Sequence, residues 1–329
     1  MDFHKLRILV TGGAGFIGSA LVWELNRRGC ANIIVTDILG TTEKWKNLSP
    51  LAVSDYLEAD DLLPHLERDA LGVFDIVLHM GACSSTTERD VSYLIRNNFE
   101  YTKRLAAWTL ANHGRFIHAS SAATYGDGSA GMSDTDPAIE KLRPLNAYGY
   151  SKHLFDLYAK RQGFLHRIAG LKYFNVFGPN ETHKGDMRSL VNKAYSQVTD
   201  TGIIRLFKSH RPDYRDGEQK RDFLYVKDAV AMTLHLAVHR DAGGLYNLGS
   251  GEAHTWLDLA GAVFSALDRE PRIEFIDMPE AIRDKYQYFT KADIGKLRST
   301  GYDQPVTPLK EAVADYIKNY MVPDRHLGD

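Results

Sequence analysis

Cysteine is scarce in this chain: Cys30 and Cys83 are the only two among 329 residues. They lie far apart and have no neighbours in a metal-ligand spacing, so the sequence predicts neither a disulfide framework nor a metal site. Long apolar runs are also missing, since none approaches the roughly 20 residues of a transmembrane helix. The first residues are a short polar lead into a strand and lack the pattern of a signal peptide. We therefore expect a cytoplasmic protein with no membrane partner.

An excess of either charge is absent as well. The 40 lysines and arginines nearly balance the 42 aspartates and glutamates. Such a chain has no global field to attract nucleic acid, so any phosphate must be held by a local site. With 44% hydrophobic residues, 329 residues suffice for one large domain or for two lobes that share a cleft. We expect a folded enzyme whose partner is a small molecule.

What the first forty residues do have is the pattern of one βαβ unit. A β-branched run at 7–11 leads into a glycine turn, and residues 16–28 then have helical spacing up to Gly29. A second buried strand at 33–36 is closed by Asp37. The glycines of the turn are Gly12, Gly13, Gly15 and Gly18.

Strand and helix continue to alternate beyond this unit. Apolar runs at 74–80, 116–120 and 171–174 are separated by helical patterns at 92–113 and 148–162. This alternation predicts an α/β fold with a Rossmann-type, doubly wound parallel sheet that binds ligands at the carboxyl ends of its strands.

After Gly178 the pattern changes. A helical pattern at 187–198 precedes a polar stretch at 208–220 that we interpret as a surface loop, and strand-like residues return at 221–226 and 244–248. We expect a smaller, discontinuous substrate-binding lobe that closes over the cleft. The expected division is a dinucleotide-binding domain of residues 1–178 and 222–249 and a substrate lobe of residues 179–221 and 250–329.

The glycine turn is a candidate dinucleotide site. Its glycines let backbone N–H groups approach a pyrophosphate at a helix N-terminus. Asp37 ends the second strand, where a carboxylate can accept hydrogen bonds from the adenosine ribose. That carboxylate favours NAD because it would repel a 2′-phosphate. Lys44 and Lys46 lie close enough in sequence to neutralise such a phosphate, so charge alone leaves NAD and NADP open.

A candidate catalytic pair follows about 130 residues later. Tyr148 and Lys152 are four residues apart and share one face of a predicted helix. The ordinary pKa of tyrosine is about 10, and a neighbouring cation lowers it toward the range of a working base. Ser121 follows the strand at 116–120, where its hydroxyl can bond the same substrate oxygen. This set suits removal of a proton from an alcohol whose hydride leaves for a nicotinamide.

The glycine turn, Ser121, Tyr148 and Lys152 together resemble the extended short-chain dehydrogenase/reductase superfamily, which includes sugar-nucleotide epimerases and dehydratases. Further stretches resemble one family within it, the ADP-L-glycero-D-manno-heptose 6-epimerases, over nearly the whole chain. These stretches are 79–88 (HMGACSSTTE), 119–126 (ASSAATYG), 146–152 (NAYGYSK), 173–179 (YFNVFGP), 183–185 (HKG) and 286–293 (YQYFTKAD).

The resemblance implies an isomerase that inverts C6″ of ADP-heptose through a 6″-keto sugar, for the supply of lipopolysaccharide core heptose. It assigns one catalytic base to Tyr148 and a second to Lys184, with Lys152 and Ser121 supporting the first. It also implies tightly bound NADP, with NAD as the alternative, and a homo-oligomer such as a pentamer. Two bases suit an inversion, because the ketone must present its other face to a fixed hydride donor.

The resemblance also supplies the binding residues. The expected cofactor residues are Gly12, Gly15, Phe16, Ile17, Gly18, Asp37, Ile38, Lys44, Asp55, Tyr56, Met80, Gly81, Ala82, Cys83, Ser84, Asn97, Tyr148, Lys152, Val176 and Lys184. The expected substrate residues are Ser85, Asn175, Asp186, Lys193, Phe207, Lys208, Ser209, His210, Arg215, Arg221 and Tyr286. Ala59, where some relatives carry a lysine, weakens the case for NADP. Asp186 and the insertion at 211–218 also depart from the family pattern and could reshape the sugar pocket.

Other functions compete with this interpretation. A UDP-hexose 4-epimerase would share the fold but would not need Lys184 as a second base. A 4,6-dehydratase commonly has Asp-Glu after the active-site Ser or Thr, where this chain has Ala122 and Ala123. A non-catalytic NAD(P)-binding regulator commonly loses the Tyr or the Lys, and both are present here.

Overall fold

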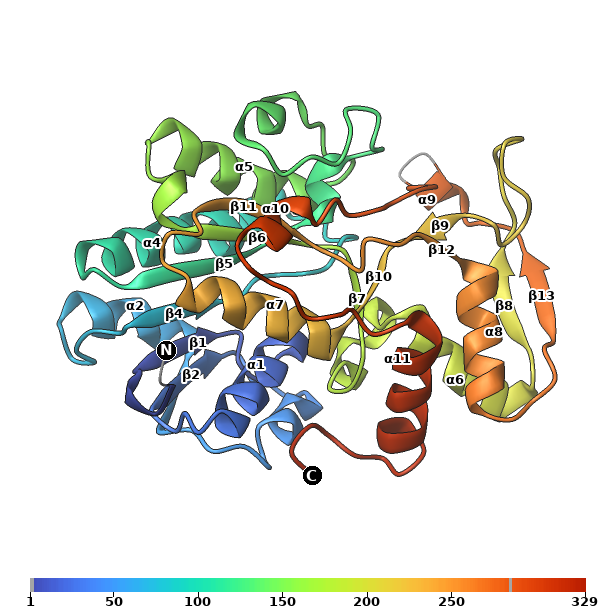
Figure 1. Cartoon of the computed structure of the whole chain (residues 1–329), viewed down its shortest axis with the longest axis horizontal. Helices are drawn as coiled ribbons and strands as arrows, with labels where there is room; N and C mark the ends of the chain where they lie inside the picture. Colours follow the sequence, from blue (N-terminus) through green and yellow to red (C-terminus); the bar gives the residue numbers. More distant parts are fainter. Residues whose placement is uncertain (1–2, 284–285) are drawn as a thin grey trace.

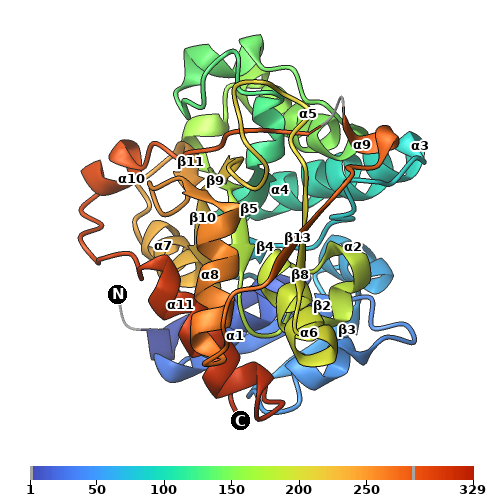
Figure 2. The ribbon, with the colours of Figure 1, turned by 90° about the vertical axis from the view of Figure 1, so that its right-hand side faces the viewer.

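The computed structural model describes residues 3–283 and 286–329. A larger lobe contains a parallel sheet between two layers of helices, and a smaller lobe lies beside it (Figure 1). Figure 2 views the molecule from the side of the smaller lobe, with helices α6 and α8 and strands β8 and β13 toward the reader. Within the described residues, no helix combines the length and apolar character needed to cross a membrane.

The main sheet confirms the predicted Rossmann-type fold. Seven strands within the described residues run in the order β11-β6-β5-β4-β1-β2-β3, and all their pairings are parallel. The order reverses beside β1, which places the topological switch point at the glycine turn. The strands are β1 (Ile8–Thr11), β2 (Ile33–Asp37), β3 (Asp55–Glu58), β4 (Ile76–His79), β5 (Arg115–Ser121), β6 (Ala169–Tyr173) and β11 (Gly244–Leu248).

Apolar side chains cover both faces of this sheet. On one face, Leu25 of α1 and Leu234 of α7 belong to the same core cluster. On the other, Leu66 of α2, Leu105 of α4 and Phe155 of α5 form a second cluster. The helices of these layers are α1 (Phe16–Arg27), α2 (Ala59–Glu67), α3 (Val91–Leu94), α4 (Tyr101–Ala111), α5 (Ala147–Arg161) and α7 (Val226–Val238).

The smaller lobe is built around a short parallel pair, β8 and β13, covered by α6 and α8. Its core is continuous with the α1–α7 side of the larger lobe. The strands outside the main sheet are β7 (Asn175–Phe177), β8 (Ile204–Phe207), β9 (Lys220–Arg221), β10 (Phe223–Tyr225), β12 (His254–Thr255) and β13 (Ile273–Ile276). The remaining helices are α6 (Leu190–Thr201), α8 (Trp256–Ala266), α9 (Glu280–Arg283), α10 (Gly295–Ser299) and α11 (Leu309–Tyr316).

The predicted start of a helix at Met187 is wrong. Helix α6 begins at Leu190, because the Ser189 hydroxyl caps it by accepting from the Asn192 N–H. Residues Thr182–Met187 instead form a 3₁₀ turn with Gly185 at φ 54°. This separate turn matters because it carries Lys184.

One buried carboxylate fastens the segments between the lobes. Asp222 lies between β9 and β10 and is fully buried. It accepts backbone N–H groups from Ser250 at 2.6 Å, Gly251 at 3.0 Å and Ala292 at 2.9 Å. Asp222 thereby fixes the segments that border the cleft relative to one another.

Candidate active site

The glycine turn leaves no room for side chains. Gly12 has φ 66°, and a Cβ there would lie 2.6 Å from Gly81 Cα. A Cβ at Gly18 would overlap the carbonyl oxygen of Gly12. Phe16 and Ile17 follow as the first residues of α1, so the turn and the helix N-terminus face the carboxyl edge of the sheet together. This cradle fits a pyrophosphate held by backbone N–H groups.

Gly18→Ala is expected to lower the free energy of unfolding by about 1–3 kcal/mol and to strip the protein of bound nucleotide, because the added methyl displaces the turn. Thermal unfolding and the nucleotide content after purification measure both effects. Gly261→Ala is the matched control, since Gly261 lies within α8 and a Cβ there meets no atom within 4 Å. Equal behaviour of the two variants would contradict this assignment of the turn.

Asp37 supports the turn and already has a cationic partner. One carboxylate oxygen accepts the Ala14 N–H at 2.9 Å, and the other lies 2.7 Å from the Lys44 ammonium. The Tyr56 hydroxyl donates to the Asp37 carbonyl at 3.0 Å. Ile38 is exposed beside them. These residues gather where an adenosine ribose would lie.

Two residues expected near the adenosine lie apart from this group. Lys46 pairs with Glu43 on the surface. Asp55 is the first residue of β3 and lies opposite Ile34, whereas the ligand edge is at the other end of that strand, where Glu58 lies opposite Asp37.

Residues 80–85 form the loop after β4, and a buried asparagine holds it. The side chain of Asn98 accepts the Cys83 N–H at 2.9 Å and donates to the Cys83 carbonyl at 2.9 Å. It also donates to the Ser151 hydroxyl on α5 at 3.0 Å. The sequence reasoning chose Asn97, whose amide donates to the Tyr93 carbonyl. The family resemblance gave no role to Asn98, which lies in the π-helical segment Ile95–Glu100.

Tyr148 and Lys152 lie on the first turns of α5, which Asn146 caps by accepting the Gly149 N–H at 2.8 Å. Burial raises the pKa of the Tyr148 phenol, and its hydrogen bond with Ser121 acts in the opposite direction. Burial lowers the pKa of Lys152 to about 8, against the opposing effect of Asp156. The structure therefore brings Ser121 and Tyr148 together, with Lys152 one helical turn further along α5.

The Lys152 side chain is largely buried, and within residues 3–283 and 286–329 its ammonium forms no hydrogen bond or ion pair. The ammonium is not among the fully enclosed polar atoms that lack a partner, so it borders open space in which a ligand can lie. The hydroxyls of a nicotinamide ribose are acceptors of the right kind for this position.

Lys184 is half-buried and lies against the start of α1. Its ammonium is 5.4 Å from the centre of the Phe16 ring at the start of α1. Burial lowers the pKa of Lys184, and Glu181 opposes that effect. The sequence reasoning missed Asn47, which holds the preceding segment: its amide donates to the Ala14 carbonyl at 2.9 Å and to the Asn180 carbonyl at 3.2 Å.

Two adjoining cavities of 310 and 280 Å³ lie beyond these residues, toward the smaller lobe. Both are lined by Leu190, Lys193 and Trp256. The first also contains Asn175 and Val176, and the second contains Phe207 and Tyr286. Several predicted substrate residues thus share one cleft.

Arg221 packs against two aromatic residues that line this cleft, Trp256 and Tyr286. Its guanidinium carbon is 5.0 Å from the centre of the Tyr286 ring and 5.6 Å from that of Trp256. The Trp256 indole N–H donates to the Tyr286 hydroxyl at 2.7 Å, which fixes the two rings. Burial lowers the pKa of Arg221, so a diphosphate nearby would favour its charged form.

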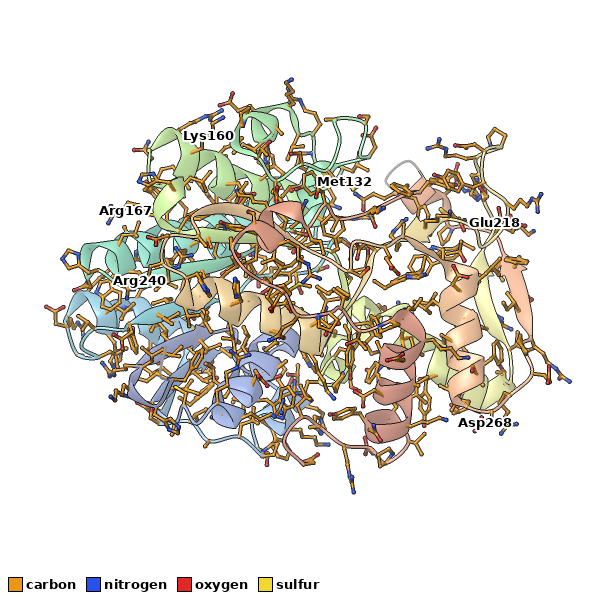
Figure 3. All side chains as sticks on the ribbon, viewed as in Figure 1. Met132, Lys160, Arg167, Glu218, Arg240 and Asp268 are labelled. Carbon is orange, nitrogen blue, oxygen red and sulfur yellow. The ribbon has the colours of Figure 1, made fainter. Side chains whose placement is uncertain are left out.

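Other predicted substrate residues lie on the partly exposed segment at 208–218. Lys208 pairs with Asp277, the Ser209 N–H donates to Asp216, and the His210 N–H donates to the Tyr288 hydroxyl. Arg215 is 88% exposed at its side chain and projects from the loop at 208–218. Glu218 of this loop lies at the outer edge of the smaller lobe (Figure 3).

Asp186 and Ser85 are not among the residues that line the two cavities. The carbonyl of Asp186 accepts from the Lys193 ammonium at 2.6 Å. The Ser85 hydroxyl lies 3.1 Å from that of Thr87.

Known proteins are similar to this chain in sequence. The model of the NAD dependent epimerase/dehydratase family matches residues 8–249. The ADP-L-glycero-D-manno-heptose-6-epimerase of Nitratidesulfovibrio vulgaris is 53% identical over 321 residues, which cover 97% of this chain and 99% of that protein. The protein of the same name from Fusobacterium nucleatum is 44% identical, over 95% of this chain and 98% of its own length.

A solved structure agrees with these relatives. The crystal structure of the Helicobacter pylori ADP-L-glycero-D-manno-heptose-6-epimerase superposes with a TM-score of 0.83 and 25% sequence identity. The superposition covers 97% of each chain.

Proposed function

Because this chain belongs to the NAD dependent epimerase/dehydratase family, we propose that it interconverts the two C6″ epimers of an ADP-glycero-manno-heptose. The reaction converts ADP-D-glycero-β-D-manno-heptose to the L-glycero epimer through a 6″-keto sugar, and it would supply heptose for lipopolysaccharide core. The observations that support this proposal are two groups able to transfer protons: Tyr148, which is beside Ser121, and Lys184, which lies against Phe16 at the start of α1.

The site fits a nicotinamide dinucleotide. Its pyrophosphate would lie on the glycine turn, its adenosine ribose beside Asp37, and its nicotinamide ribose on the Lys152 ammonium. When bound, a nicotinamide dinucleotide would supply hydride transfer from and to the sugar carbon. Side chains of the protein carry out the proton transfers.

Two side chains move the protons. Tyr148 removes the proton of the C6″ hydroxyl as the alcohol becomes a ketone, and the Lys152 cation stabilises the phenolate. Rotation about the bond to C6″ then presents the other face of the ketone. The new alkoxide needs a proton from the other side, and Lys184 supplies it. Burial favours this role because it lowers the pKa of the Lys184 ammonium and so makes it a stronger acid.

For the cofactor we propose NADP over NAD. The support is the 2.7 Å contact between Lys44 and Asp37, which neutralises the carboxylate that would repel a 2′-phosphate. Lys44→Met is expected to weaken NADP binding by about 10- to 100-fold, the usual effect of a lost hydrogen bond to a charged group. Mass analysis of released nucleotide and titration of the stripped protein measure this preference. Lys46→Met, which removes a surface lysine paired with Glu43, is the control. Unchanged NADP affinity in Lys44→Met would contradict the proposal.

A direct assay tests the function. Purified protein is incubated with ADP-D-glycero-β-D-manno-heptose without added reductant, and the epimers are resolved by chromatography. Formation of the L-glycero epimer supports the proposal. No conversion of the heptose, together with turnover of UDP-hexoses, would assign the chain to the 4-epimerases instead.

A further inference from the structure

A buried charge network lies beneath the catalytic residues. Asp156 is on α5, four residues after Lys152, and is fully buried. One of its oxygens accepts from the Ser120 hydroxyl at 2.8 Å and from the Lys172 ammonium at 2.9 Å. The other lies 3.2 Å from Nε2 of His118. Strands β5 and β6 therefore hold this carboxylate in one place against α5.

The same network reaches Ser121 from both sides. Ser120 precedes it directly, and Lys172 also donates to the Thr124 hydroxyl at 2.6 Å. Thr124 in turn donates to the Ser121 carbonyl at 2.7 Å. The Asp156 cluster is thus part of the framework that carries the residues in contact with the substrate.

The carboxylate is charged in the folded protein. Burial alone would raise the pKa of Asp156, but Lys172 and His118 outweigh burial and hold that pKa below its ordinary value. A buried lysine paired with an aspartate is no stability requirement, since apolar replacements of such pairs are often tolerated. We therefore look to the neighbouring residue, Lys152, for the role of the Asp156–Lys172 ion pair.

Lys152 has few other sources of negative charge. Cys83, from the loop after β4, and Asp156 are the groups that favour its charged form. His79 on β4 and His118 on β5 also face it, and both have pKa values lowered by burial and by Lys152 itself, so they are neutral near pH 7. The phenol of Tyr148 is uncharged until it takes part in proton transfer. Asp156 is the fixed anion of this group.

We propose that Asp156 is a positioning residue that keeps the Lys152 ammonium charged beneath Tyr148. The inference rests on the proposed function, in which a charged Lys152 stabilises the Tyr148 phenolate. Without the carboxylate, burial of Lys152 loses the largest effect that opposes it. The ammonium then loses its proton at a lower pH, and Tyr148 loses its cationic neighbour.

The test measures the ionisation of Lys152 directly. Holoenzyme labelled with [¹³C]lysine is titrated by NMR, and the Lys152 Cε signal is assigned with Lys152→Met. The variants are Asp156→Asn and the double variant Asp156→Asn/Lys172→Met, which avoids a buried unpaired lysine and keeps the test open if the single variant fails to fold. Asp228→Asn, at a carboxylate of α7 that binds Thr307, is the control.

We expect the Lys152 midpoint to fall by about one pH unit in Asp156→Asn, to fall by less in the double variant because the Lys172 cation is removed as well, and to stay unchanged in Asp228→Asn. The alkaline limb of the kcat profile should move with it, giving a roughly fivefold lower kcat at pH 8 with little change in KM. An unchanged Lys152 midpoint in the Asp156 variants would overturn the inference. Failure of the wild-type protein to epimerise the heptose would count against the proposed function alone, because the NMR titration needs no substrate.

Discussion

Tyr148→Phe is expected to lower kcat for heptose epimerisation by about 10²- to 10⁴-fold, the usual contribution of a general base. The substitution keeps the ring and removes only the hydroxyl that Ser121 contacts. The fold should therefore survive with a loss of about 1 kcal/mol in the free energy of unfolding, the value of one hydrogen bond. Steady-state kinetics with ADP-D-glycero-β-D-manno-heptose measure the effect.

Tyr150→Phe is the matched control for this variant. Tyr150 lies two residues further along the same helix and is 47% exposed, outside the Ser121 contact. It should retain wild-type kcat. Similar losses in both variants would show that the helix, and not the Tyr148 hydroxyl, limits activity.

Lys184→Met is expected to lower kcat by about 10²- to 10³-fold while the protein keeps its bound nucleotide. Methionine fills much of the space of the lysine and can still pack on Phe16, but it cannot transfer a proton. The expected defect is specific to a mechanism with two bases, since a 4-epimerase would tolerate the change. Kinetics and the nucleotide content of the purified variant are measured together.

Lys310→Met, at an exposed position of α11, controls for the loss of one positive charge. Wild-type activity of Lys184→Met would remove the second base from the mechanism. Loss of activity together with loss of nucleotide would make Lys184 a binding residue and leave its proton-transfer role unsupported.

The sheet was largely predictable from sequence because its central strands are short apolar runs separated by long helical patterns. Strand β3 was not predicted, since its sequence DYLE is half exposed and has no apolar run. The start of α6 was misplaced because apolar spacing continues upstream through Met187, while the Ser189 cap decides where the helix begins. Capping overrides periodicity at such an end.

The candidate site likewise contains residues that local sequence patterns reveal and residues that they do not. The glycine turn and the Tyr148–Lys152 pair are local patterns, so sequence revealed them. Lys184 was found only through the family resemblance, because nothing in its neighbourhood shows that the 3₁₀ turn lies against Phe16. Asn47 bridges segments more than 130 residues apart in sequence, and such long-range contacts leave no periodic signal.

The central claim is that the hydrogen on C6″ leaves and returns as a hydride. The most direct test uses ADP-D-glycero-β-D-manno-heptose carrying deuterium at C6″, with mass and NMR analysis of the L-glycero product formed in ordinary water. The account predicts that the product keeps the deuterium at C6″. Replacement of the label by solvent hydrogen would contradict it, because the hydrogen would then have left C6″ as a proton.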